Sequence, residues 1–283
     1  MSEFTQKLSK AWTLALSDPL ALLTAVKPYL FQPKSEKILL NGVVFDIELD
    51  LDPAMKAMYF GAYQIHIASF MKKHLKKGDI FIDVGANVGY ISAYAMGLIG
   101  QTGQVHAFEP VPEYFARLNQ VQKNNPDYRL YINRVALGES EGTATIAVTN
   151  VQNIGWNTMV PDFMSRETIK EKIEIPVTTL DSYLSSEQIE RVRLVKIDVE
   201  GFEFPVIKGF QNYLQTAKEL PILLVEVAPA AYHKLDTSIN QFANLMSDLG
   251  YVALTLDLKH EVQLLQLQDT TDVVFMPKSD QGL

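Results

Sequence analysis

Acidic side chains stand where apolar segments of this sequence end, and such positions can do chemistry. Asp83 lies inside the apolar run 81–84, Glu109 follows another run, and Asp198 and Glu226 close two more. A carboxylate at such a place is costly unless it has a partner. It can hold the hydroxyl groups of a ligand, or take a proton from a hydroxyl or amine that attacks an electrophile. These positions therefore indicate a ligand site with acid–base groups.

A glycine turn follows Asp83. The segment Gly85-Ala86-Asn87-Val88-Gly89 leads into a helical pattern that begins at Tyr90. Glycine lets the backbone turn sharply and lets a ligand approach closely, and the next helix aims free N–H groups at the same place. The turn fails the dinucleotide pattern, because Asn87 and Tyr90 stand where the second and third glycines belong. A pyrophosphate would therefore fit poorly, and an ordinary strand-to-helix turn stays open.

The spacing between this turn and the next acidic residue narrows the class of ligand that the site could bind. Glu109 lies 24 residues after Gly85, where nucleoside-binding α/β folds place a carboxylate on the ribose hydroxyls. The combination predicts a nucleoside-like ligand. Singly, Asp83 could instead cap the helix, and Glu109 could be an exposed charge at a strand end.

A second group of acids follows the apolar run 194–197. Asp198, Glu200 and Glu203 come after it, and Glu226 ends the next run. Because the carboxyl ends of neighbouring parallel strands share one crevice, Asp198 and Glu226 are expected to face the same cavity. Glu203 fits an acid in the first turn of a helix. Asp198 with Glu226 could also chelate magnesium, but no third ligand is obvious, so we assign no metal site.

Loops supply further candidates for acceptor binding. His233 leaves the same edge as Glu226 and can act as a general base, or simply stand in solvent. Trp156 and Asn157 lie between two extra β runs, and an aromatic ring with an amide suits a sugar or peptide acceptor. A packing role for Trp156 stays open. Together with Glu200, these residues are our candidates for acceptor contacts in the loops.

The elements that position these residues alternate from residue 79 onward, which predicts parallel strands joined by crossover helices. Two extra β runs cover 143–149 and 174–177, and the runs 262–268 and 272–276 predict a terminal hairpin or edge. The main predicted strands are 80–84, 104–109, 129–135, 193–198, 222–227 and 251–256. The predicted helices are 90–99, 112–124, 202–213 and 239–249.

The N-terminal part reads differently. Residues 1–35 predict two short amphipathic helices that pack on the body or serve a dimer or membrane-surface contact, and 37–51 predicts a hairpin around Asn41-Gly42. A helix over 55–75 would carry Tyr63 on one face, lining an acceptor pocket or making an ordinary packing contact. We expect an extension over 1–54 and a main domain over 55–283.

Composition excludes several classes of protein. The 283 residues include no cysteine, which rules out disulfides, thiolate metal sites and a cysteine nucleophile, and fits a cytoplasmic location. A net charge of −8 disfavours a nucleic-acid partner. Asp18-Pro19 and Lys27-Pro28 interrupt the most apolar N-terminal stretch, so no membrane span is expected.

These motifs make the sequence resemble the FkbM family of class I S-adenosylmethionine-dependent methyltransferases. The resemblance covers roughly residues 60–276. It implies a Rossmann-like sheet, mostly parallel and seven-stranded, with helices on both faces. The segments that carry it are Gly78 to Tyr90, Phe108-Glu109-Pro110, Ala136-Leu137-Gly138 and Lys196-Ile197-Asp198-Val199-Glu200-Gly201.

The resemblance also implies roles for single residues. The glycine turn would wrap the methionine part of the cofactor, Glu109 would hold the ribose, and the segment 134–137 would lie beside the adenine. Asp198 would lie near the methyl group, with Glu226 and His233 as the other catalytic candidates. The cofactor-binding candidates are Asp83, Gly85, Asn87, Gly89, Tyr90, Glu109, Pro110, Val135, Ala136 and Asp198.

The family association implies methyl transfer from S-adenosylmethionine to a hydroxyl of a sugar or secondary metabolite, leaving S-adenosylhomocysteine. A carboxylate helps at the acceptor, which gains positive charge, and hinders beside the sulfonium, which loses it. Three alternatives stay open: N-methylation of a peptide side chain, a nicotinamide oxidoreductase, and a binding module without activity.

Overall fold

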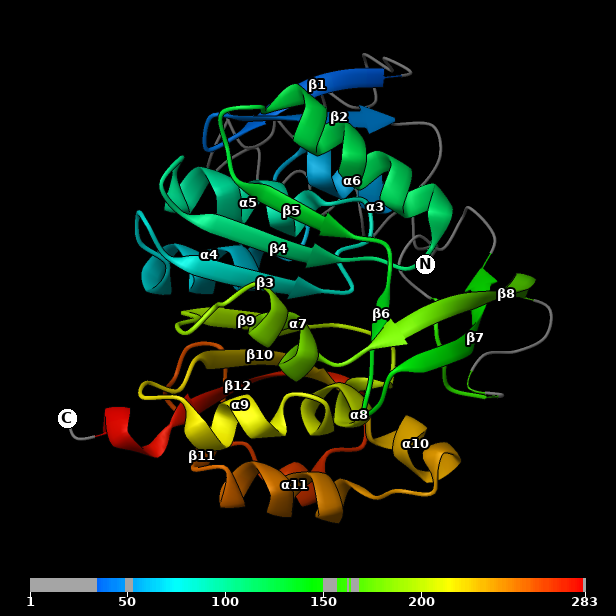
Figure 1. The fold of residues 1–283 in the computed structure, drawn as a ribbon, viewed down its shortest axis with the longest axis vertical. Helices are drawn as coiled ribbons and strands as arrows, with labels where there is room; N and C mark the ends of the chain where they lie inside the picture. Colours follow the sequence, from blue (N-terminus) through cyan, green and yellow to red (C-terminus); the bar gives the residue numbers. More distant parts are fainter. Residues whose placement is uncertain (1–34, 49–52, 150–156, 162, 164–167, 282–283) are drawn as a thin grey trace, which may run out of the picture.

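A computed structural model describes residues 35–281 apart from 49–52, 150–156, 162 and 164–167. Its main strands are β3 (Ile80–Val84), β4 (Gln104–Phe108), β5 (Leu130–Asn133), β9 (Leu194–Ile197), β10 (Ile222–Val227), β11 (Tyr251–Leu254) and β12 (Thr271–Pro277). They form one seven-stranded sheet in the order β11-β12-β10-β9-β3-β4-β5 (Figure 1). Only β12 runs antiparallel to the other six strands. The predicted α/β fold with a mostly parallel sheet is confirmed.

Helices cover both faces of this sheet, which explains why its strands are apolar throughout. One face carries α4 (Ile65–His74), α5 (Tyr90–Ile99) and α6 (Pro112–Asn124). The other carries α7 (Leu180–Ser186), α8 (Glu203–Lys208), α9 (Gln211–Thr216) and α11 (Ile239–Asp248). Each face has its own apolar core, so the polar groups at the strand ends stand out against apolar surroundings.

The predicted N-terminal hairpin is present and shares the core of the α5 face. Strands β1 (Ser35–Leu40) and β2 (Val43–Glu48) pair antiparallel around Asn41-Gly42. Phe45 is buried and meets the ring of Tyr90 edge-on, with centroids 5.5 Å apart. The Asn125 side chain bonds both the N–H and the carbonyl of Val44 at 2.8 Å. The predicted helices over 1–35 and their dimer contact fall outside the described residues.

A small three-stranded sheet stands beside the main one (Figure 1). It contains β6 (Ala136–Leu137), β7 (Gly142–Thr149) and β8 (Ile169–Thr178), in the order β6-β8-β7. Strand β8 is longer than the predicted run 174–177. An isolated antiparallel bridge pairs Thr158 with Ala147 of β7.

Two predicted helices are each broken in two. The helix over 55–75 becomes α3 (Pro53–Tyr59) and α4, and Gln64 between them has a left-handed backbone with φ 44°. Tyr63 therefore lies in a turn, and its predicted place on a face of one helix over 55–75 is wrong. The helix over 202–213 splits into α8 and α9 at Gly209, where a Cβ would collide with the carbonyl of Gly138.

The predicted terminal hairpin is also wrong in part. Residues 262–268 form no strand, and only a short 3₁₀ turn over Leu264–Gln266 occurs there. The antiparallel partner of β12 is β11 on one side and β10 on the other. The run begins beside β11, where Glu261 bridges Leu254 and the Val262 N–H donates to the Ala253 carbonyl at 2.9 Å, but no strand follows from this contact.

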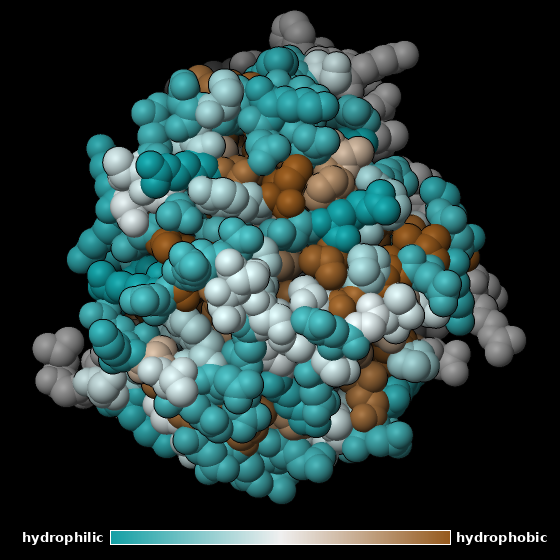
Figure 2. Space-filling model, viewed as in Figure 1, coloured by the Kyte–Doolittle hydropathy of each residue, from teal (hydrophilic) through white to brown (hydrophobic). Residues whose placement is uncertain are grey.

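The surface of the described residues is mostly hydrophilic on the face in Figure 2, with apolar side chains in small patches. The large exposed apolar residues, Leu39, Ile65, Tyr131 and Leu265, are scattered over different elements. Among the helices that the structure describes, none has the length and apolar character needed to cross a membrane.

Candidate active site

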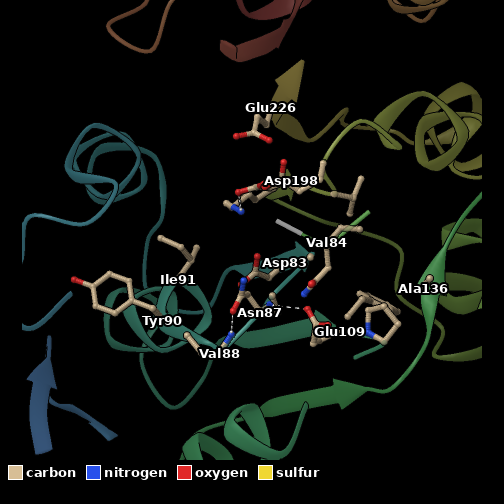
Figure 3. Close-up of a pocket in the computed structure, with 18 of the residues that line it drawn as sticks. Asp83, Val84, Asn87, Val88, Tyr90, Ile91, Glu109, Ala136, Asp198 and Glu226 are labelled. Atoms are coloured by element: carbon tan, nitrogen blue, oxygen red, sulfur yellow. Dashed lines mark hydrogen bonds and ion pairs between the residues drawn. The ribbon is translucent and has the colours of Figure 1, made fainter. Parts of the chain in front are cut away.

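A cavity of about 440 Å³ opens at the carboxyl ends of β3, β4, β9 and β10 (Figure 3). Parallel strands place their carboxyl ends at one edge of the sheet, so residues far apart in sequence meet there. The cavity brings together thirteen of the residues predicted for the site. These are Tyr63, Asp83, Gly85, Asn87, Tyr90, Glu109, Pro110, Val135, Ala136, Asn157, Asp198, Glu200 and Glu226.

Glu109 stands at one end of this cavity with both oxygens held by the backbone. The N–H groups of Asn87 and Val111 donate to its two oxygens at 2.9 and 2.8 Å. Burial raises the pKa of Glu109 to about 7, although both N–H donors lower it. Each carboxylate oxygen has a further lone pair, so a ligand hydroxyl can still donate to it.

The glycine turn joins this end of the cavity to the acidic end. Gly85 has φ 79°, and a Cβ there would collide with the carbonyl oxygen of Asp198. Only glycine therefore allows the loop after β3 to lie against the end of β9. Gly89 caps α5 and also has a positive φ, but it does not line the cavity.

A row of charged side chains crosses the sheet on its α5 face. Asp83 on β3 is paired in register with Lys196 on β9. The Lys196 ammonium contacts Asp198 Oδ2 at 2.7 Å, and its side chain is 4% exposed. The hydroxyl of Ser92 donates to Asp83 Oδ2 at 2.6 Å, while Asp83 Oδ1 has no hydrogen-bond partner.

This arrangement separates the protonation states of the acids. Burial alone would lower the pKa of Lys196, but Asp198 and Asp83 outweigh it and hold that pKa above its usual range. Burial alone would raise the pKa of Asp198, but the Lys196 charge outweighs it and lowers that pKa. Asp198 is therefore the ionised member of the cluster.

Glu200 and Glu226 complete the acidic end. Oxygens of Asp198, Glu200 and Glu226 lie within 4.8 Å of one another. Burial, followed by the charge of Asp198, raises the pKa of Glu200 to about 8 and raises that of Glu226 as well. Three such oxygens can in principle hold a divalent cation, which supplies the third ligand that the sequence did not reveal. The neighbouring Lys196 ammonium already supplies positive charge there.

The backbone holds Glu200 in an unusual conformation. Its φ is 52°, a left-handed value that costs a non-glycine residue free energy. The hydroxyl of Thr158 donates to the Glu200 carbonyl at 2.7 Å, and the Gly201 N–H donates to Glu203 Oε1 at 2.7 Å. Two hydrogen bonds thus fix the turn that carries the Glu200 side chain at the cavity.

Tyr63 and Asn157 border the acidic end. The Tyr63 ring meets the Tyr90 ring edge-on, with centroids 5.5 Å apart. Burial, followed by the charge of Asp198, raises the pKa of Tyr63, so its hydroxyl keeps its proton. Asn157 Oδ1 accepts the N–H of Thr149 at 3.0 Å, which ties its loop to β7. Both side chains line the cavity.

Besides Gly89, one more predicted residue that the structure describes lies away from the cavity. His233 is exposed and does not line the cavity. It begins the 3₁₀ turn His233–Leu235 after α10 (Pro229–Tyr232), and burial of the preceding Tyr232 against Phe204 and Phe242 leaves His233 toward solvent. Trp156 lies outside the described residues.

Sequence reasoning missed Lys196 and Gln64. Lys196 lies two residues before Asp198 in a strand, so both side chains point to the same face. A lysine inside the run Leu194–Ile197 was the available signal, because a buried ammonium needs a carboxylate. Gln64 donates through Nε2 to Asp198 Oδ2 at 3.4 Å, and no sequence pattern marks it.

The chain matches a known protein family and is similar to curated proteins. A family model described as "Methyltransferase FkbM domain" matches residues 83–253. The hexuronic acid methyltransferase AglP of Haloferax volcanii is 24% identical over 183 residues, covering 65% of this chain and 70% of that protein. The 31-O-demethyl-FK506 methyltransferase FkbM of Streptomyces tacrolimicus is 26% identical over 207 residues, covering 64% and 75%.

One solved structure is similar to this chain at a lower sequence identity. It is the methyltransferase FkbM from Methylobacillus flagellatus, which is 16% identical with a TM-score of 0.44. The match covers 81% of this chain, and this chain spans 56% of that protein.

Proposed function

Because this chain belongs to the FkbM methyltransferase family, we propose that it transfers a methyl group from S-adenosylmethionine to an acceptor hydroxyl. The acceptor would be a sugar or a secondary metabolite. One observation carries the proposal: a single cavity holds Glu109 at one end, the acidic cluster around Asp198 at the other, and the glycine turn between them. Two similar proteins, a hexuronic acid methyltransferase and a 31-O-demethyl-FK506 methyltransferase, support an oxygen acceptor.

The residues present fit S-adenosylmethionine. The free lone pairs of Glu109 suit two ribose hydroxyls, and the apolar side chains of Phe108, Val135 and Leu137 suit the adenine. The close approach that Gly85 permits suits the methionine part. When bound, the cofactor supplies an electrophilic methyl group on a sulfonium. The excess of carboxylates along the cavity favours a cationic ligand.

Asp198 is the residue that we assign to the acceptor proton. Lys196 keeps it ionised, and Gln64 helps to orient it. An ionised carboxylate beside the acceptor hydroxyl accepts the proton as the oxygen attacks, and such general-base assistance contributes about 10²–10⁴-fold. Glu226 and Glu200, whose pKa values are raised, hold protons nearby and are available as hydrogen-bond donors.

The test of this assignment is Asp198→Asn, measured by S-adenosylhomocysteine release in the presence of polyol acceptors. We expect turnover to fall by about 100-fold or more. Affinity for S-adenosylhomocysteine should change little. The matched control is Asp248→Asn on the exposed side of α11, which should keep full turnover. Undiminished methylation by Asp198→Asn would move the proton acceptor elsewhere.

The ligand class has its own test. Calorimetry should detect binding of S-adenosylhomocysteine and none of NADH. Binding of NADH alone would contradict the methyltransferase proposal and favour an oxidoreductase.

A further inference from the structure

We infer that the methyl acceptor is an uncharged polyol, such as a neutral sugar, and that this cavity rejects acceptors with a carboxylate or phosphate near the reacting hydroxyl. The inference rests on the proposed function, because it concerns the part of the cavity beyond the cofactor. It states which class of acceptor the cavity binds, and neither the Asp198→Asn assay nor the NADH calorimetry tests that.

The first argument is the balance of charge. The described residues that line the cavity include five carboxylates, namely Asp83, Glu109, Asp198, Glu200 and Glu226. They include a single cation, Lys196, and neither arginine nor histidine. The Lys196 ammonium is already paired with Asp198 at 2.7 Å. An anionic acceptor would therefore enter a space lined by carboxyl groups without a free cation to pair with.

The second argument is the type of hydrogen-bonding group that the cavity offers. Asp83 is fully buried, yet its Oδ1 has no hydrogen-bond partner. Glu226 Oε2 and Gln64 Oε1 are likewise buried oxygens without a partner, and both side chains line the cavity. Buried oxygens of this kind need hydrogen-bond donors, which a ligand can supply. Hydroxyl groups of a polyol supply them, whereas an ionised carboxylate or phosphate offers only acceptors.

Protonation of the glutamates does not remove the argument. If Glu200 and Glu226 are neutral, they can donate to the acceptor hydroxyls as well as accept from them. An anion still loses its hydration shell on entry, and no cation replaces that shell. Both states of the cluster therefore favour an uncharged acceptor.

The opposite preference would need a metal. A divalent cation held by Asp198, Glu200 and Glu226 would reverse the local charge and could bridge an anionic acceptor. The hexuronic acid named for the curated relative shows that the choice between neutral and acidic sugars is a real one in this family. The experiment is therefore run both with EDTA and with Mg²⁺.

The experiment compares matched pairs of ligands in the presence of saturating S-adenosylhomocysteine. Methyl glycosides of glucose, galactose and mannose are each compared with the corresponding methyl uronide by calorimetry. With EDTA present, we expect at least one hexoside to bind about tenfold more tightly than its uronide. Equal or tighter uronide binding would overturn the inference, and so would binding of none of the three hexosides.

The other outcomes are equally decisive. A uronide that binds only with Mg²⁺ would overturn the inference in favour of a metal-bridged anion. Failure of S-adenosylhomocysteine itself to bind would instead overturn the proposed function, which keeps the two failures distinct.

A variant tests whether the glutamates cause the discrimination. In Glu200→Gln/Glu226→Gln the shape is kept, and the two carboxyl groups are replaced by amides, which cannot ionise and which offer N–H donors to an anion. We expect the ratio of hexoside to uronide affinity to fall at least about threefold, with S-adenosylhomocysteine affinity retained as the check on folding. Glu219→Gln, at an exposed site paired with Arg191, is the matched control and should keep the wild-type ratio. An unchanged ratio in the double variant would refute the inference.

Discussion

At the scale of single residues, Glu109 shows how a buried acid can be prepared for a ligand. Its two backbone hydrogen bonds orient the carboxylate before anything binds, so little reorganisation is needed on binding. The same bonds make the side chain part of the glycine turn. Replacing it therefore tests both binding and local structure.

We predict that Glu109→Gln weakens S-adenosylhomocysteine binding by about tenfold or more, because charge-assisted hydrogen bonds to the ribose become neutral ones. Glutamine can keep one backbone bond, so the fold should persist, as circular dichroism can check. The exposed Glu113 on α6, changed to Gln, is the control. Unchanged affinity by calorimetry would remove the ribose assignment.

Glu203 makes a prediction about pH. It is fully buried at the start of α8, and burial raises its pKa to about 8, above an ordinary value of about 4.3. The native state therefore binds this proton more tightly than the unfolded state. The stabilisation is complete below about pH 4, falls as the pH rises and is gone above about pH 8.

Denaturant titrations at pH 5 and pH 8 check this sign. The free energy of unfolding should fall by roughly 3–4 kcal/mol more in the wild type than in Glu203→Gln, whose side chain does not titrate. The raised pKa values of Glu109 and Glu200 also make the free energy of unfolding fall as the pH rises. Because both proteins contain these residues, the difference between their pH dependences reports Glu203. Identical slopes would mean that Glu203 titrates normally.

At the scale of elements, the turn from β9 to α8 concentrates strain where the acceptor would bind. Glu200 keeps a left-handed backbone although glycine or asparagine would suit it better. A residue retained against local preference is expected where its side chain has a function.

We predict that Glu200→Gly raises the free energy of unfolding by about 1 kcal/mol, because relief of the left-handed strain exceeds the added backbone entropy. Methyl transfer should fall in the same variant. Glu200→Gln keeps the strain and serves as the comparison. A glycine variant less stable than the glutamine variant would show that the turn is not strained.

The same scale shows what the sequence could predict. Strands such as β3 and β10 were predicted to the residue, because long apolar runs buried on both faces leave few alternatives. The breaks at Gln64 and Gly209 were missed, since each depends on a distant contact or a backbone angle. Lys196 was missed because one of its partners, Asp83, becomes its neighbour only when the sheet forms.

At the scale of the whole molecule, the hairpin and the main sheet share one core. Phe45 of β2 packs on Tyr90, and Tyr90 lines the cavity. The proposed boundary near residue 54 therefore does not separate two independent cores. Loss of packing in the hairpin is expected to reach the site.

We predict that Phe45→Ala lowers the free energy of unfolding by about 3–5 kcal/mol, because its ring is almost fully buried. It should also weaken S-adenosylhomocysteine binding, through the loss of support for Tyr90. Leu39→Ala in the same hairpin, at a side chain that is 71% exposed, should change stability by less than about 0.5 kcal/mol. Two separate unfolding transitions in the wild type would contradict a shared core.

The strand order has a consequence for synthesis of the chain. Strand β3 lies inside the finished sheet, yet its partner β9 begins 110 residues after β3 ends. At about 5–20 residues per second, the free edge of β3 waits roughly 5–20 s on the ribosome before β9 can cover it. An uncovered apolar edge is open to pairing with other chains. The nascent protein therefore passes through an aggregation-prone interval, during which a chaperone has an apolar strand to bind.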